Sequence, residues 1–185
     1  NSSKVLDKIY TFNQTPNISI EFYEPVIVTF SRLVSGDNQH TITFPPTTQL
    51  SKTAGFRITE KLQNGEYTFE LNAKNQNGIS MAPPFSTAII IDNITPDLNI
   101  SPSNGAVVGI SLVKINLTFS EEVRLKTAKI NSEDKSRLFS TSNNKLFSAE
   151  INLPDGNKRL DVVGEDYARN QVSKSGTFVV DAAPT

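Results

Sequence analysis

The side chains that could carry out acid–base or nucleophilic chemistry are few, since the sequence has one histidine and no cysteine. The histidine, His40, follows the turn-forming run Gly36-Asp37-Asn38-Gln39. A Ser-His-acid triad needs its histidine beside a nucleophile on a strained turn, and no Gly-x-Ser-x-Gly run occurs. We therefore expect His40 to be an exposed loop residue. The lack of cysteine excludes thiol catalysis, zinc ribbons and disulfide scaffolds.

Two pairs of neighbouring carboxylates could serve glycoside hydrolysis, in which one carboxyl acts as acid and the other as base or nucleophile. They are Glu121-Glu122 and Glu165-Asp166. Such a site also needs an aromatic platform for the sugar, and the chain has no tryptophan. We expect both pairs to be solvated turn charges. Phosphate-binding glycine loops and zinc-binding His-Glu-x-x-His runs are missing as well, so we predict no catalytic residues and no enzyme activity.

The composition narrows the fold and the partners. Ser, Thr and Asn number 19, 17 and 18 among 185 residues, and these residues suit turns and exposed strand faces. The 18 basic and 19 acidic side chains give a net charge of −1, which argues against nucleic-acid binding. No run of about 18 apolar residues exists, so we predict no membrane-spanning segment.

Alternation of apolar and polar residues is the dominant pattern, as in strands with one buried face. Val113, Ile115, Leu117 and Phe119 alternate with polar residues, and so do Tyr67, Phe69, Leu71 and Ala73. Residues 26–30 alternate more weakly, and shorter runs include 41–44, 56–60, 88–91, 123–130, 145–151, 158–163 and 177–180. Short strands at a spacing of roughly 8–12 residues, bounded by turn residues, predict an all-β sandwich.

The chain also repeats itself, which indicates two units. Ile18-Ser19-Ile20 follows Thr15-Pro16-Asn17, and Leu98-Asn99-Ile100 follows Thr95-Pro96-Asp97. Each half later has a Leu-x-[Asn/Asp]-Gly run before an alternating strand, starting at Leu62 and at Leu153. We interpret residues 1–15 as the end of a preceding unit or a linker, 16–94 as the first sandwich and 95–185 as the second. The short Pro-containing linker predicts an extended, semi-stiff array.

These residues resemble bacterial immunoglobulin-like domains. In the first part of the second unit, the similar runs are Ser101-Pro102-Ser103-Asn104-Gly105 and Leu117-Thr118-Phe119-Ser120-Glu121-Glu122-Val123. Near the end of the second unit, the similar runs are Gly164-Glu165-Asp166-Tyr167-Ala168-Arg169-Asn170 and Phe178-Val179-Val180-Asp181. The first unit departs further, since Phe30-Ser31-Arg32 lacks the acidic pair.

The resemblance implies two tandem Ig-like sandwiches of about seven strands each, without the disulfide and tryptophan of antibody domains. It implies an extracellular or bacterial cell-surface protein of many such units, used as a stalk or adhesion region. The partners would be neighbouring units of the same chain, with a host-surface or matrix protein or a glycan as further candidates. An accessory carbohydrate- or substrate-binding module of a secreted polysaccharide-degrading enzyme is the alternative.

Modules that resemble these often bind Ca²⁺ where units meet, through loop carboxylates. The candidates in this chain are Asp92, Asp97, Glu121, Asp166 and Asp181. Ca²⁺ needs about six to eight oxygen ligands, and the first unit has mostly Asn at the matching positions. Asp166 and Asn170 can instead bond the backbone of their own turn. We therefore expect no metal site and no cofactor, and Ca²⁺ remains the alternative.

Sugar binding would need exposed aromatic side chains. The candidates are Tyr23, Phe56, Phe85, Phe147 and Tyr167. Most aromatic residues fall at inward positions of alternating strands, so we expect core packing for all of these except Tyr23 and Tyr167.

Overall fold

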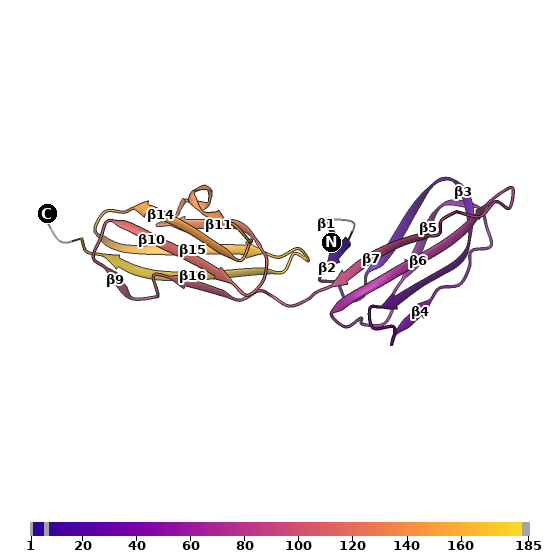
Figure 1. The fold of residues 1–185 in the computed structure, drawn as a ribbon, viewed down its shortest axis with the longest axis horizontal. Coiled ribbons are helices and arrows are strands. Elements are labelled where there is room, and N and C mark those ends of the chain that lie inside the picture. The colour runs from indigo at the N-terminus through magenta and orange to yellow at the C-terminus, as the bar shows by residue number, and fades with distance from the viewer. Residues whose placement is uncertain (1, 6–7, 183–185) are drawn as a thin grey trace. The chain divides into compact units, whose positions relative to one another are not determined.

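A computed structural model describes residues 2–5 and 8–182 of the chain. The fold is all-β, and the described residues contain one short 3-10 helix, η1 (Ser136–Leu138), as their only helical element. Internal contacts divide the chain into Asn1–Asn93 and Ile94–Thr185. Figure 1 shows a β-sandwich in each unit, which confirms the predicted fold class. No helix in the described part is long and apolar enough to cross a membrane.

The described residues of the first unit form seven strands, joined by hydrogen bonds in the order β1-β2-β7-β6-β3-β4, with β5 paired to β3. Their bounds are β1 (Ser2–Val5), β2 (Lys8–Thr11), β3 (Asn17–Ser35), β4 (Thr41–Thr43), β5 (Ser51–Arg57), β6 (Gly65–Asn75) and β7 (Phe85–Ile91).

The long strand β3 belongs to both layers of the first sandwich. Its first part, from Asn17 to Glu21, pairs with β5. Its second part, from Val26 to Ser35, pairs with β6. The rings of Phe44, Phe56 and Phe69 meet in the core, with centroid separations of 5.0–6.2 Å.

The second unit has two separate sheets. One has the order β13-β14-β10-β8 and the other β12-β11-β15-β16-β9. The bounds are β8 (Leu98–Ser101), β9 (Ala106–Val108), β10 (Leu112–Phe119), β11 (Arg124–Ile130), β12 (Glu133–Asp134), β13 (Ser140–Thr141), β14 (Leu146–Asn152), β15 (Gly156–Glu165) and β16 (Gln171–Val180).

The inward residues predicted from alternation are buried. Val113, Ile115, Leu117 and Phe119 are at most 3% exposed. In the first unit Phe69, Leu71 and Ala73 are fully buried and Tyr67 is 5% exposed. Each unit has its own apolar core, because each cluster of buried residues draws on one unit alone.

Both units place an early strand parallel to their last one. In the first unit β2 runs parallel to β7, from Lys8↔Ala88 to Thr11↔Ile91. In the second unit β9 runs parallel to β16, from Ala106↔Phe178 to Val108↔Val180.

The parallel strand β2 corrects the expected boundary of the first unit. Residues 8–11 form β2, Thr11 is 2% exposed, and Ile9 packs against the core of the first unit. These residues therefore belong to the first sandwich. The assignment of residues 1–15 to a preceding unit or a linker is wrong for residues 8–11. The second unit begins at Ile94, one residue before the expected position.

The matching Thr-Pro segments also differ in structural role. Ile18 and Ile20 lie in the part of β3 that pairs with β5. Leu98 and Ile100 lie in β8, which flanks β10 on the side away from β14. The strand predicted at 56–60 begins earlier, since β5 spans Ser51–Arg57. Sequence similarity at these points arises from a shared Pro-then-strand pattern, and not from equivalent strands.

A close backbone approach in the second core leads to a testable prediction. A Cβ atom added at Gly164, on β15, would lie 2.5 Å from Cε1 of the buried Phe119 ring. Gly164→Ala should therefore lower the free energy of unfolding of the second unit by about 1–3 kcal/mol, because the ring must move within a packed core. Urea unfolding measures this loss. Gly176→Ala is the control, since its nearest neighbour is 3.9 Å away, and an equal loss in both variants would contradict the steric explanation.

Candidate functional site

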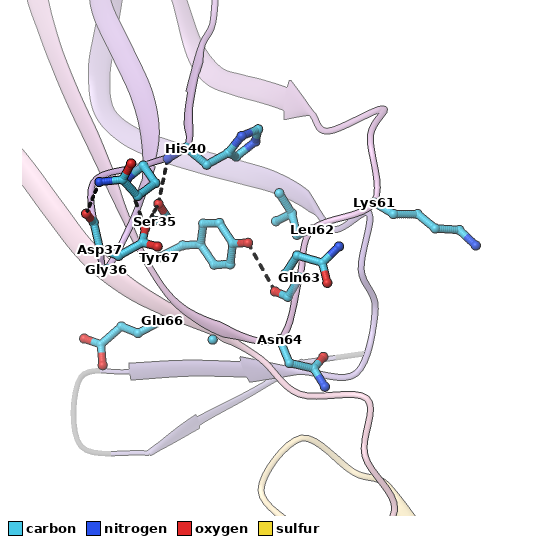
Figure 2. A pocket seen from close by; sticks show the side chains of 12 residues that line it. Ser35, Gly36, Asp37, His40, Lys61, Leu62, Gln63, Asn64, Glu66 and Tyr67 are labelled. Atoms are coloured by element: carbon cyan, nitrogen blue, oxygen red, sulfur yellow. Dashed lines mark hydrogen bonds between the residues drawn. The ribbon is translucent and has the colours of Figure 1, made fainter.

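One candidate site in the described residues is a pocket of ≈ 480 Å³ in the first unit, shown in Figure 2. It lies between the turn that follows β3 and the segment that leads into β6. The lining residues are Ser35, Gly36, Asp37, Gln39, His40, Lys61, Leu62, Gln63, Asn64, Gly65, Glu66 and Tyr67.

The turn after β3 is organised by polar contacts around Asp37. The Ser35 hydroxyl and the Gln39 backbone N–H both donate to Asp37 Oδ1, at 2.5 and 3.0 Å. These bonds hold the pKa of Asp37 below its ordinary value, the Ser35 bond contributing most. The backbone N–H of His40 donates to Ser35 Oγ at 2.9 Å. The Ser35 hydroxyl is thus committed to the turn.

His40 is an exposed loop residue, as predicted. Its side chain is 45% exposed, and Nε2 lies 3.4 Å from Glu60 Oε1. Ser35 Oγ contacts Asp37 and the His40 backbone rather than the imidazole. The pocket therefore has a histidine and a serine but not the serine–imidazole hydrogen bond of a nucleophilic relay.

The inner wall of the pocket has a structural role. The Tyr67 hydroxyl donates to the carbonyl of Gln63 at 3.2 Å, as Figure 2 shows, and burial raises the pKa of Tyr67. In the second unit Lys158 stands at the same place after its Leu-x-Asp-Gly run, and its Nζ donates to the Asp155 carbonyl at 3.2 Å. A tyrosine at the start of this strand has the same function in immunoglobulin sandwiches. Both side chains therefore fasten the turn before the strand.

The two carboxylate pairs behave differently from one another. Glu122 is on the surface, where its Oε2 accepts from the Tyr167 hydroxyl at 3.3 Å. Glu165 accepts from the Gln171 amide, which lowers its pKa. Asp166, however, is only 4% exposed, so the prediction of a solvated charge is wrong for it.

Asp166 fastens the turn between β15 and β16, which is the alternative role expected for it. The backbone N–H of Asn170 donates to its Oδ1 at 2.8 Å, and the Asn170 side-chain amide donates to its Oδ2 at 2.7 Å. The Asp166 backbone N–H in turn donates to the Asn170 carbonyl at 3.0 Å. Burial is tolerated because the carboxylate receives charge-assisted hydrogen bonds.

Three further calcium candidates have backbone hydrogen bonds within their own units. The backbone N–H of Asp92 donates to the Thr11 carbonyl, and that of Asp181 donates to the Val108 carbonyl. The backbone N–H of Asp97 donates to Ser120 Oγ. Within the second unit, carboxylate oxygens of Glu121 and Asp166 lie within 4.8 Å of each other. Ca²⁺ requires roughly six to eight oxygens, more than this pair supplies, and the expected absence of a metal site stays a prediction.

The exposed aromatic residues differ in part from those predicted. Tyr23 is fully exposed, whereas Phe56 and Phe147 are buried at 5% and 6%, as expected. Tyr167 is half-buried and bonded to Glu122, so it is less exposed than predicted. Sequence reasoning missed Phe30, which is 41% exposed although alternation from Val26 and Val28 placed it inside. The spacing of the aliphatic residues could have indicated the exposure of Phe30. Val28 and Leu33 are both buried but lie an odd number of positions apart, whereas residues on one face of a regular strand lie an even number apart.

Comparison with known proteins found similar structures at low sequence identity. No family model and no curated protein matches the sequence. Among solved structures, the fibronectin(III)-like modules of Clostridium thermocellum CbhA are 17% identical, with a TM-score of 0.49, over 96% of this chain and 90% of that one. A tetra-tandem repeat from the extending region of a large adhesion protein is 17% identical, with a TM-score of 0.43 and 95% of this chain covered.

A third match is a Bacteroides ovatus glucan-utilisation protein solved with a mixed-linkage heptasaccharide, at 13% identity and a TM-score of 0.29. This chain spans about half the length of that protein and of the adhesion repeat, 46% and 48% respectively. Two of these structures are of repeated modules, which are fibronectin(III)-like in CbhA and a tetra-tandem repeat in the adhesion protein.

Proposed function

We propose that this chain is a non-catalytic structural module of a bacterial extracellular or cell-surface protein. It forms part of a longer tandem array of Ig-like units that acts as a stalk or adhesion region. Its partners are the neighbouring units of the same chain.

The observation that supports this proposal most is the modular construction of the chain. Two complete sandwiches follow each other, each with its own sheets and its own buried core. A chain built in this way gains length by adding units, since each unit buries its own apolar surface. The Ser-, Thr- and Asn-rich composition provides polar outer faces.

The non-catalytic role rests on the chemistry of the candidate pocket. The Ser35 hydroxyl is bound to Asp37, the imidazole of His40 is turned to Glu60, and Tyr67 fastens a turn. Ser35, His40 and Tyr67 thus each have a partner that explains the position of the side chain. We argue the function from this site, because a fold alone does not determine a function.

A replacement experiment in the full-length protein tests the proposal. Residues 1–185 are deleted, or are replaced with two unrelated Ig-like units of the same length, and attachment of cells that display the protein is measured. Deletion should reduce attachment, and replacement should restore most of it, because a stalk contributes reach rather than specific chemistry. Replacement that performs no better than deletion would contradict the stalk function.

A further inference from the structure

A β-bulge in the first unit turns a large aromatic side chain from the core to the solvent. The register of β3 against β6 runs Val28↔Ala73 and then Phe30↔Asn72, so that Thr29 is the extra residue. The bulge reverses the two faces of the strand beyond it. Phe30 becomes 41% exposed, and Ser31 becomes fully buried. Bulges commonly redirect a side chain in this way beside functional sites.

This arrangement is unfavourable for packing alone. A phenylalanine faces water while a serine occupies the core, which reverses the usual distribution of these residue types. Ser31 Oγ has no hydrogen-bond partner among the described residues, and an unsatisfied buried hydroxyl is destabilising. Positions that break local rules without a gain in packing are expected at functional sites. The exposed Phe30 ring is therefore the feature that requires an explanation.

Phe30 lies in a groove of ≈ 280 Å³ on the outer face of the strands β3, β6 and β7. The register places Phe30 opposite Asn72, Arg32 opposite Glu70, and Glu70 opposite Ser86. An aromatic ring and a row of polar side chains thus lie next to each other across three strands. The groove is lined by Thr29, Phe30, Glu70, Asn72, Pro84, Phe85 and Ser86.

The ring and the polar row are held in place by one arginine. The Arg32 guanidinium carbon lies 5.4 Å from the centroid of the Phe30 ring, within range of a cation–π interaction. Its Nε donates to Glu70 Oε2 at 2.6 Å. The ion pair balances the charge of the groove. The two contacts of Arg32 place the Phe30 ring and the Glu70 carboxylate next to each other, where one ligand can contact both.

We propose that this groove binds a neutral oligosaccharide, with one sugar ring packed on the face of Phe30 away from Arg32 and its hydroxyls bonded to Glu70 and Asn72. The apolar face of a sugar suits an aromatic ring. The Glu70 carboxylate accepts from a sugar hydroxyl, and the side-chain NH₂ of Asn72 donates to one, because Asn72 Oδ1 already accepts from the Ala73 N–H at 2.8 Å. The paired charges of Arg32 and Glu70 leave no excess charge for an anionic ligand. This inference goes beyond the stalk function, which needs no groove.

The test is glycan binding by the whole chain. A printed array that includes hexamers of β-linked glucose, xylose and N-acetylglucosamine is probed first, and the best oligosaccharide is then titrated calorimetrically. Phe30→Ala and Phe30→Leu should weaken binding at least tenfold, and Phe30→Tyr should retain it, because the ring face and not mere apolarity is required. Glu70→Gln should also weaken binding. Amide NMR shifts on titration should centre on β3 and β6.

Two controls separate this site from others. Phe12→Ala removes a phenylalanine of almost equal exposure, 42%, in the same unit, and Tyr23→Ala removes a fully exposed aromatic residue. Both variants should bind as the parent does. Failure to bind any oligosaccharide on the array would overturn the proposal, as would binding that Tyr23→Ala or Phe12→Ala abolishes and Phe30→Ala leaves intact. The stalk function is tested independently, because its experiment measures cell attachment by the full-length protein and not glycan binding.

Discussion

Replacing Phe69 with alanine is expected to lower the free energy of unfolding of the first unit by about 3–5 kcal/mol. Phe69 is fully buried and contacts the rings of Phe44 and Phe56, with centroids 6.2 and 5.0 Å away. Its removal leaves a cavity between the two layers that three aromatic side chains now fill. Since a domain of this size is stable by only about 5–15 kcal/mol, the loss should be large enough to see in any unfolding curve.

Urea unfolding followed by amide NMR signals of each unit measures this effect separately in the two cores. The signals of the second unit should keep their midpoint, because no residue of its core cluster belongs to the first unit. Phe12→Ala, on the surface, is the matched control. If Phe69→Ala does not fold, Phe69→Leu provides the smaller step. A loss below about 1 kcal/mol for Phe69→Ala would show that the layers do not pack around this ring.

The second unit should respond in the same way to Leu117→Ala, with a loss of about 2–5 kcal/mol. Leu117 lies in the middle of β10, between β14 and β8, and is fully buried. The neighbouring Thr118 is exposed on the opposite face of the same strand. Thr118→Ala should therefore cost less than about 1 kcal/mol, the range of strand propensity. Similar losses for both variants would contradict the assigned faces of β10.

The second sandwich could be predicted well because its strands follow strict alternation. Val113 to Phe119 keep one face in the core without interruption, so periodicity alone assigns the buried residues. The first sandwich was harder for a physical reason. Its strand β3 serves both layers and contains a bulge, and a single extra residue reverses every assignment beyond it. Phe30 was misplaced for this reason.

The boundary of the first unit and the environment of Asp166 could not be predicted from local sequence patterns, because both depend on contacts that such patterns do not show. Residues 10–16 look like the Pro-containing linker near Pro96, yet Tyr10 and Thr11 pair with Ile90 and Ile91 at the other end of the unit. Asp166 looked like a solvated charge because its burial depends on how its turn closes. His40 was placed correctly because its turn is local, and local turn chemistry is readable from sequence.

The parallel pairing of an early strand with the last strand determines how each unit would bear a pulling force. Tension between the start of β2 and the end of β7, or between the start of β9 and the end of β16, draws the paired strands past each other along their length. Four register pairs in the first unit and three in the second are then loaded in shear, all at once. An antiparallel end pair would instead be peeled open one bond at a time. Mechanical resistance in this chain is therefore concentrated in a few residues at the ends of each sandwich, apart from the cores that set its thermal stability.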